Sequence, residues 1–225
     1  MSYLSIKDFN IYNNLDNVQS YLLIIKNKRY LYSLINDMKN DCSEMEHIQV
    51  FDTSNKKINN LETIEFVPSI FYLDINSKKN INILLKILKN SFKDQTKIII
   101  NSFTEELDKF FKNIRFDSPV SIVSDINIDE NDLFKLLNIS IKDDSISVLE
   151  KILNFIDVTF ELRKIKVFIF YNLISFLEVD EVKFLIEKCK QLCISLVDIE
   201  YNCHIYKEFD VIKILDNDLC LLENI

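Results

Sequence analysis

The 225-residue chain contains no glycine, no tryptophan, two prolines and two histidines. Without glycine, neither a G-x-x-x-x-G-K-[ST] phosphate loop nor a G-x-G-x-x-G turn can form, because both need glycine where the backbone approaches phosphate closely. The common nucleotide-cradling loops are therefore excluded. The two histidines, His47 and His204, have no serine or cysteine nucleophile at motif spacing, which argues against a nucleophile–histidine active site.

Long apolar runs are also absent, since no stretch approaches the roughly 20 residues that a bilayer crossing needs. The first eight residues lack the basic-then-apolar layout of a secretion signal. We therefore expect a cytoplasmic protein with no membrane partner.

The five cysteines follow no repeating interval, and we expect them to be small buried hydrophobic residues of a reduced protein. A zinc site is disfavoured because the spacing does not give two matched pairs of ligands. Its candidate ligands would be Cys189, Cys193, Cys203 and His204.

Hydrophobic residues make up 48% of the chain and charged residues 28%, which is typical of a globular protein. Residues 20–27 form a short continuous apolar run that predicts a buried strand. Apolar residues at helical spacing then predict a helix over residues 29–40, and further strands are predicted over 48–52, 63–67 and 69–74. The alternation of strand and helix predicts parallel pairing.

Helical periodicity dominates residues 77–164, with one helix over 77–90 that continues toward Lys97 and another over 103–113. Strand patterns return at 166–172.

Capping residues mark two more helices in this central region. Asp129 or Asn131 can begin a short helix that ends near Asn138, a residue that tolerates the left-handed conformation. Ser147 with Glu150 three residues later is a capping-box pattern that predicts the start of a long helix.

The last third is predicted to hold a helix over 178–191, a strand over 193–200 and a hairpin over 212–222. Taken together, the pattern predicts an α/β fold with a mainly parallel sheet built from both chain ends. Residues 1–76 and 165–225 would form this head domain, and residues 77–164 an inserted α-helical leg domain.

Local clusters of charge matter more than the formal net charge of −8, because charges more than about 8–10 Å apart are screened at cellular salt. Residues 78–97 hold six lysines and one acid, Asp94. On one continuous helix these lysines would form a stripe roughly 28 Å long that could follow a phosphate backbone. The alternative is the solvated face of an amphipathic helix. The six are Lys78, Lys79, Lys86, Lys89, Lys93 and Lys97.

Two smaller basic clusters are ordinary surface features unless an assembly gathers them around a ligand. Lys28 and Arg29 lie where a strand meets a helix, and Lys56 and Lys57 lie in a turn. We include these four residues among the candidate DNA-binding residues.

The acidic segment 125–132 could supply oxygen ligands to calcium, although it lacks the spacing and the glycine of an EF-hand. The alternative is a helix N-terminus with favourable acidic residues. The candidate ligands are Asp125, Asp129, Glu130 and Asp132.

A metal-dependent nuclease site could be drawn from Asp52, Asp74 and Asp198, which are predicted to lie at strand ends. Such a trio arises easily by chance among 35 acidic residues.

The C-terminal third resembles the small accessory adaptation protein of type II-A CRISPR systems. The resemblance begins with K-I-K-V-F-I-F-Y-N at residues 164–172 and continues through residues 176–177, 180–182, 196–200, 214–218 and 220–222. Weaker similarity covers residues 50–52 with Lys56-Lys57, residues 70–75 and residues 133–139, where Asn138 replaces a frequent glycine.

This resemblance implies a head lobe with a parallel sheet and a helical leg lobe. It further implies a tetrameric ring of identical subunits that is threaded by double-stranded DNA, bound calcium, and no established enzymatic activity. The implied partners are the integrase subunits and the RNA-guided nuclease of the same locus. We therefore expect a non-catalytic DNA-end-binding subunit of spacer acquisition; a metal-dependent nuclease and a purely structural α/β interaction protein are the alternatives.

Overall fold

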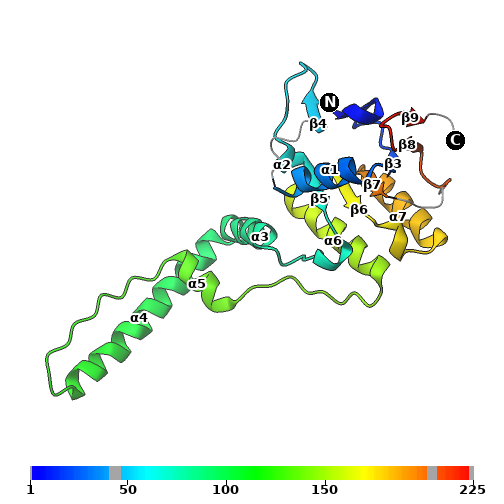
Figure 1. Cartoon of the computed structure of the whole chain (residues 1–225). Coiled ribbons are helices and arrows are strands. Elements are labelled where there is room, and N and C mark those ends of the chain that lie inside the picture. The colour runs from blue at the N-terminus through cyan, green and yellow to red at the C-terminus, as the bar shows by residue number, and fades with distance from the viewer. Residues whose placement is uncertain (1, 41–46, 202–206, 223–225) are drawn as a thin grey trace. The chain divides into compact units, whose positions relative to one another are not determined.

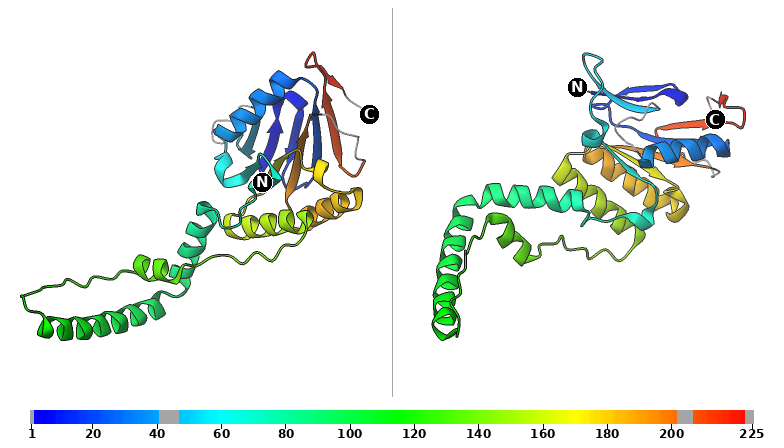
Figure 2. Two further views of the ribbon diagram at one scale, coloured as in Figure 1. Left: turned by 60° about the horizontal axis from the view of Figure 1, so that its bottom comes forward. Right: turned by 60° about the vertical axis from the view of Figure 1, so that its left-hand side comes forward.

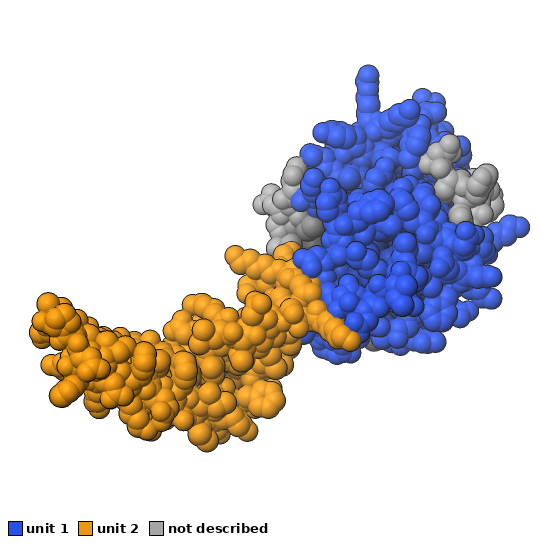
Figure 3. Space-filling model, turned by 90° about the horizontal axis from the view of Figure 1, so that it is seen from below, with its two compact units in different colours: residues 1–75, 143–225 blue, residues 76–142 orange. Residues whose placement is uncertain are grey.

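The computed structural model describes residues 2–40, 47–201 and 207–222. The chain divides into two compact units, coloured separately in Figure 3. We call residues 1–75 with 143–225 the head unit and residues 76–142 the leg unit.

The head unit contains a six-stranded sheet in the order β5-β6-β7-β3-β8-β9 (Figure 1). All neighbouring strands are parallel except the last pair, which forms the predicted hairpin. β3, from the N-terminal part of the chain, lies between two C-terminal strands, so both chain ends build one sheet and the predicted α/β class is confirmed. The strands are β3 (Ser20–Ile25), β5 (Ile64–Val67), β6 (Val167–Tyr171), β7 (Ser195–Glu200), β8 (Val211–Leu215) and β9 (Leu221–Leu222).

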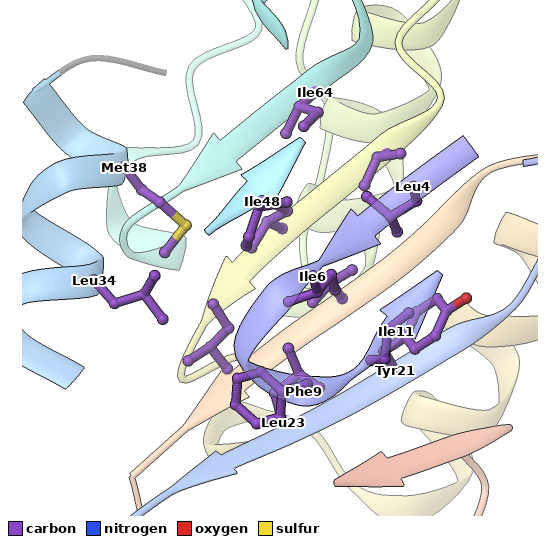
Figure 4. Packing of buried hydrophobic residues seen from close by; sticks show 14 of the residues in the cluster. Leu4, Ile6, Phe9, Ile11, Tyr21, Leu23, Leu34, Met38, Ile48 and Ile64 are labelled. Atoms are coloured by element: carbon purple, nitrogen blue, oxygen red, sulfur yellow. The ribbon is translucent and has the colours of Figure 1, made fainter. Parts of the chain in front are cut away.

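The central strands β3 and β6 are mainly apolar on both sides, as expected of strands whose two faces are covered. One face carries Leu23 and Val197, which belong to the main hydrophobic core together with α1 (Lys28–Asn40) (Figure 4). The other face is covered by α6 (Val148–Arg163) and α7 (Val179–Gln191), as Figure 2 shows.

A second, three-stranded antiparallel sheet completes the core on the α1 side. It consists of β1 (Ser2–Ile6), β2 (Ile11–Asn14) and β4 (Ile48–Asp52), in the order β2-β1-β4. Sequence patterns predict no strand before residue 20, and they group residues 48–52 with the parallel strands. That grouping is wrong, because β4 pairs with β1 along its whole length.

Short helical turns connect these elements, and one of them corrects a predicted strand. Residues 69–74 do not form a strand: Ser69 accepts a hydrogen bond from the amide of Phe71 (3.3 Å) and caps a 3-10 helix. The turns are η1 (Lys7–Phe9), α2 (Asn60–Thr63), η2 (Ile70–Tyr72) and η3 (Ile174–Phe176).

Helix α6 belongs to the head unit, although the sequence analysis placed residues 143–164 in the leg. Its Phe155 ring packs edge-on against Phe168 of β6, with ring centroids 6.3 Å apart. Its Arg163 forms an ion pair with Glu65 of β5 (2.7 Å). The helix therefore contributes to the sheet's cover, and the leg unit ends at residue 142.

The leg unit consists of α3 (Lys78–Ser91), α4 (Lys93–Asp117), α5 (Glu130–Leu137) and extended segments. Its two ends are joined by Asn76, whose side chain exchanges two hydrogen bonds with the backbone of Ile141 (2.9 and 2.7 Å). Within the described ranges, no helix is both long and apolar enough to cross a membrane.

A chain without glycine must place other residues in the left-handed backbone region. Seven described residues have positive φ, and four of them are asparagine, which tolerates this conformation best among non-glycine residues. Cys193 (φ 57°) is an exception. It follows Leu192, the C-cap of α7, and its amide donates to the carbonyl of Lys190 (3.1 Å) to close the helix.

Replacing Cys193 by glycine is expected to raise the free energy of unfolding by about 1 kcal/mol, because the left-handed strain is relieved. Cys193 is exposed, so the loss of its side chain removes no core packing. Urea unfolding of C193G against C193A is the measurement, since alanine keeps the strained geometry. Equal stability of the two variants would contradict the interpretation.

Candidate nucleic-acid interface

The predicted lysine stripe begins on α3, whose N-terminus is capped by the Ser77 side chain. Lys78, Lys79 and Lys86 are exposed, and in the part of the chain that the structure describes they have no hydrogen-bond or ion-pair partner. Lys89 is different: its ammonium group donates to the side-chain oxygen of Asn131 on α5.

The helix does not continue across residues 78–97, which corrects the single 28 Å stripe. Phe92 leaves the helical conformation (φ −119°, ψ 25°), and the chain changes direction there before α4 begins at Lys93 (Figure 2). Lys93 and Lys97, both exposed and without a described partner, therefore lie on a different helix from the other four lysines.

The four remaining predicted DNA-binding residues lie in the head unit. Lys28 and Arg29 are in the first turn of α1, and Lys28 lies over the ring of Tyr201 (5.3 Å to the centroid). Lys56 and Lys57 are exposed in the turn after β4. All ten candidates are surface residues, but they belong to separate clusters in two units.

Charge is distributed unevenly between the units. Residues 76–142 carry 11 basic and 9 acidic residues, whereas the rest of the chain carries 16 basic and 26 acidic ones. The leg unit is thus slightly basic in a strongly acidic protein, and its cations concentrate in α3 and the first turns of α4.

The acidic segment forms a helix cap at the start of α5. Asp129 accepts from the amide of Asp132 (2.9 Å), and Asp132 accepts from the amide of Asp129 (3.2 Å). The hydrogen bond from the Asp132 amide, followed by one from the Asn131 side chain (3.1 Å), lowers the pKa of Asp129. The cap engages two of the four predicted calcium ligands. Asp125 is exposed, and the side chain of Glu130 lies outside the described part of the structure.

Two acids of the alternative nuclease site serve structural roles. Among the described residues, no three His, Cys, Asp or Glu side chains are grouped so that they could hold a metal ion. In the nuclease trio, Asp52 stabilises its own turn by accepting from the amides of Ser54 and Lys56, and Asp198 is buried within β7.

The described cysteines are free thiols, and they are not all buried as expected. Cys189 is buried, which raises its pKa to about 12, whereas Cys193 and Cys220 are exposed. The other proposed zinc ligands, Cys203 and His204, lie outside the described residues.

A buried pair of acids was missed by the sequence analysis. Asp198 (0% exposed) and Glu200 (1%) lie two residues apart on β7, so both face the α6–α7 side of the sheet. The amides of Leu173 and Ile174 donate to the two oxygens of Asp198 (3.2 Å each). Burial, followed by repulsion from Glu200, raises the pKa of Asp198, and burial raises the pKa of Glu200 to about 7.

A cleft between α3 and α5 was also missed. It has a volume of about 430 Å³, and its floor is formed by Leu85 and Phe134. Lysine and asparagine side chains surround this floor. The sequence indicates the α3 side of this cleft, because Asn82 and Asn90 fall on the same helical face as Lys86 and Lys89.

A smaller cavity of about 340 Å³ adjoins the N-terminus of α1 in the head unit. It is mainly apolar and aromatic. Its lining residues are Lys28, Leu31, Tyr32, Ile35, Tyr171 and Tyr201.

Helix α4 exposes an unusual amount of apolar surface. Of its 25 residues only Thr96 is buried. Large apolar side chains along it are exposed, with Phe116 at 89%. They are Ile98, Ile99, Phe103, Phe110, Ile114 and Phe116.

Comparison with known proteins places the chain in a family. The family described as CRISPR-associated protein (Cas_Csn2) matches residues 41–219. The crystal structure of Stu0660 of Streptococcus thermophilus is similar with a TM-score of 0.56 at 12% identity, over 96% of this chain and 74% of that chain. The crystal structure of MJ1267, an ATP-binding cassette of an ABC transporter in its ADP conformation, gives a lower TM-score of 0.44. The identity is 14%, over 96% of this chain and 87% of that chain.

No curated protein sequence matched the chain. The likeness to Stu0660 shows a shared fold, and the family match extends over most of the sequence. This chain therefore belongs to the type II-A Csn2 family of CRISPR-associated adaptation proteins.

Proposed function

We propose that this chain is a non-catalytic subunit that binds double-stranded DNA, near its ends, during CRISPR spacer acquisition. One observation carries the proposal: five exposed lysines of the leg unit have no acidic partner among the described residues. They are Lys78, Lys79, Lys86, Lys93 and Lys97.

Lysines of this kind suit phosphate rather than base recognition. A flexible ammonium group without a fixed partner can follow a phosphate backbone, and such contacts release counterions from DNA. They carry no sequence information by themselves. The expected binding is therefore independent of sequence and falls steeply as salt is added.

We further propose that copies of the chain form a ring around the DNA, as the family resemblance implies. The exposed apolar side chains of α4 support self-association, because contiguous exposed apolar surface marks interaction sites. A homotetramer is the expected assembly. The integrase subunits and the RNA-guided nuclease of the same locus are its proposed partners.

Calcium remains a prediction from the same resemblance, and residues 125–132 are its proposed binding segment. The acids of this segment support the proposal, and two of them, Asp129 and Asp132, also cap α5. If calcium orders the assembly, dialysis against a chelator will lower the mass measured by light scattering, and added calcium will restore it.

Loading on linear and closed-circular duplex of the same sequence tests the function. A ring threaded from an end is expected to shift the linear DNA in a mobility assay at low salt, to fail on the circle, and to release the linear DNA at high salt. Equal binding to the circle contradicts threading. A monomer indifferent to both DNAs would favour a structural interaction protein, and cleavage with magnesium or manganese would favour a nuclease.

A further inference from the structure

The cleft between α3 and α5 has the size and chemistry of a small-ligand site. Its volume of about 430 Å³ lies within the roughly 300–1,000 Å³ of typical ligand pockets. Both helices belong to the leg unit, so the cleft is complete within one unit. Its lining residues are Asn82, Leu85, Lys86, Lys89, Asn90, Asn131, Phe134 and Lys135.

Two of the three lysines in the cleft are available to an anion. Among the described residues, Lys86 has no partner, and Lys89 donates a hydrogen bond to a neutral carboxamide, that of Asn131. Lys135 is ion-paired with Asp132 (3.2 Å), and that acid also belongs to the cap of α5. No described acid lines the cleft, so the positive charge of Lys86 and Lys89 is not neutralised there, and a phosphate would neutralise it.

The floor and rim of the cleft suit a flat heterocycle. Phe134 is 8% exposed, and the Lys89 nitrogen lies over its ring, 5.7 Å from the ring centroid, so the part of the ring that the cleft exposes lies beside the charge. Aromatic rings bind nucleic-acid bases by stacking. The exposed carboxamides of Asn82 and Asn90 carry both donors and acceptors, as base edges do.

We propose that this cleft binds one unpaired nucleotide, with its phosphate on Lys86 and Lys89 and its base against Phe134. A base inside a duplex is covered by its neighbours, so only a nucleotide outside the stack can reach an aromatic floor. The ligand is either the overhanging nucleotide at a DNA end or a free mononucleotide. The first source rests on the proposed DNA-binding function, and the second does not.

Titration with deoxyadenosine monophosphate tests the cleft alone. Chemical-shift changes in a nitrogen–proton NMR spectrum are expected on α3 and α5, with a dissociation constant on the order of 1 mM for so small a contact area. Replacing Lys86 and Lys89 by alanine is expected to weaken binding at least ten-fold. The matched control replaces Lys78 and Lys79, on the same helix but outside the cleft, and should bind the nucleotide normally.

Duplexes with and without a one-nucleotide overhang test the end-binding source. The overhang is expected to tighten binding roughly ten-fold, the value of one stacked base. F134L keeps an apolar floor without an aromatic ring, so this variant should lose the gain while binding blunt duplex unchanged. Circular dichroism will show that the variant is folded.

The outcomes separate the two proposals. If neither the mononucleotide nor the overhang binds in the cleft while blunt duplex is still held, the cleft assignment is overturned and the DNA-binding function stands. If the mononucleotide binds and no duplex does, the cleft assignment stands and the DNA-binding function fails.

Discussion

The free energy of unfolding is expected to fall by on the order of 2–3 kcal/mol as the pH rises from about 5 to about 8. The cause is the buried pair of Asp198 and Glu200. Burial favours the protonated form of both acids, and the pKa of Glu200 rises from 4.5 to about 7 on folding. Stability that depends on the bound proton is fully present below the unfolded pKa and is lost as the pH rises through the folded pKa.

Glu200→Gln isolates this effect, because the amide has the shape of the protonated acid without its titration. The variant is expected to show a flatter pH profile between 5 and 8 and to be more stable than the parent protein at pH 8. Urea unfolding at several pH values, followed by circular dichroism, is the measurement. If the free energy of unfolding of the variant still falls with pH as steeply as that of the parent protein, Glu200 is not the source of the pH dependence.

Asp198→Asn provides a contrasting variant. Both Asp198 oxygens accept backbone amides, so an asparagine would turn an amino group toward one of these donors. This change is expected to destabilise the protein at every pH, by about 1–3 kcal/mol for an unsatisfied buried donor. A gain in stability at pH 8 from Glu200→Gln, together with a loss from Asp198→Asn, would distinguish a proton-binding pair from a general loss of packing.

The affinity for duplex DNA is expected to fall about a hundred-fold or more when Lys78, Lys86 and Lys93 are all replaced by glutamate. Each reversal removes a cation that neutralises phosphate and adds a repulsive charge, and the electrostatic part supplies essentially all non-specific affinity. The three side chains are exposed and without a described partner, so the fold should be retained. Fluorescence anisotropy at fixed salt is the measurement.

A matched triple variant separates the effect of local charge on DNA affinity from the effect of the total charge. Lys109, Lys112 and Arg115 lie further along α4, and the two lysines already pair with Glu106 and Asp108 (2.6 Å each). Reversing these three changes the net charge by the same amount. A loss of affinity as large as that of the first variant would show that DNA responds to the total charge, not to the face that α3 and the start of α4 present.

Strong local signals explain why the head's main sheet was predictable. The V-F-I-F-Y run of β6 is apolar at its first four positions and ends in tyrosine. Such a run predicts a strand that is covered on both faces. β1 and β2 gave no such signal, because only alternate residues such as Leu4 and Ile6 are buried and polar residues lie between them. Which sheet a strand joins is decided by tertiary packing, so β4 was grouped with the wrong strands.

The site was harder to predict than the fold. The break at Phe92 has no glycine or proline to mark it, and helical periodicity continues on both sides. The contact of Lys89 with Asn131 joins residues 42 positions apart, which no local pattern reports. Asp198 and Glu200 were visibly on one face of a strand, but their burial depends on α6 and α7 covering that face.

The acid pair also makes folding an exchange of hydrogen ions with the solvent. Between the unfolded pKa of Glu200, 4.5, and its folded pKa of about 7, the folded pair retains a proton that the unfolded chain would have released. In that pH range the native molecule is therefore less negative than its formal charge of −8. The heat of unfolding measured by calorimetry should accordingly vary with the ionisation enthalpy of the buffer that receives this proton.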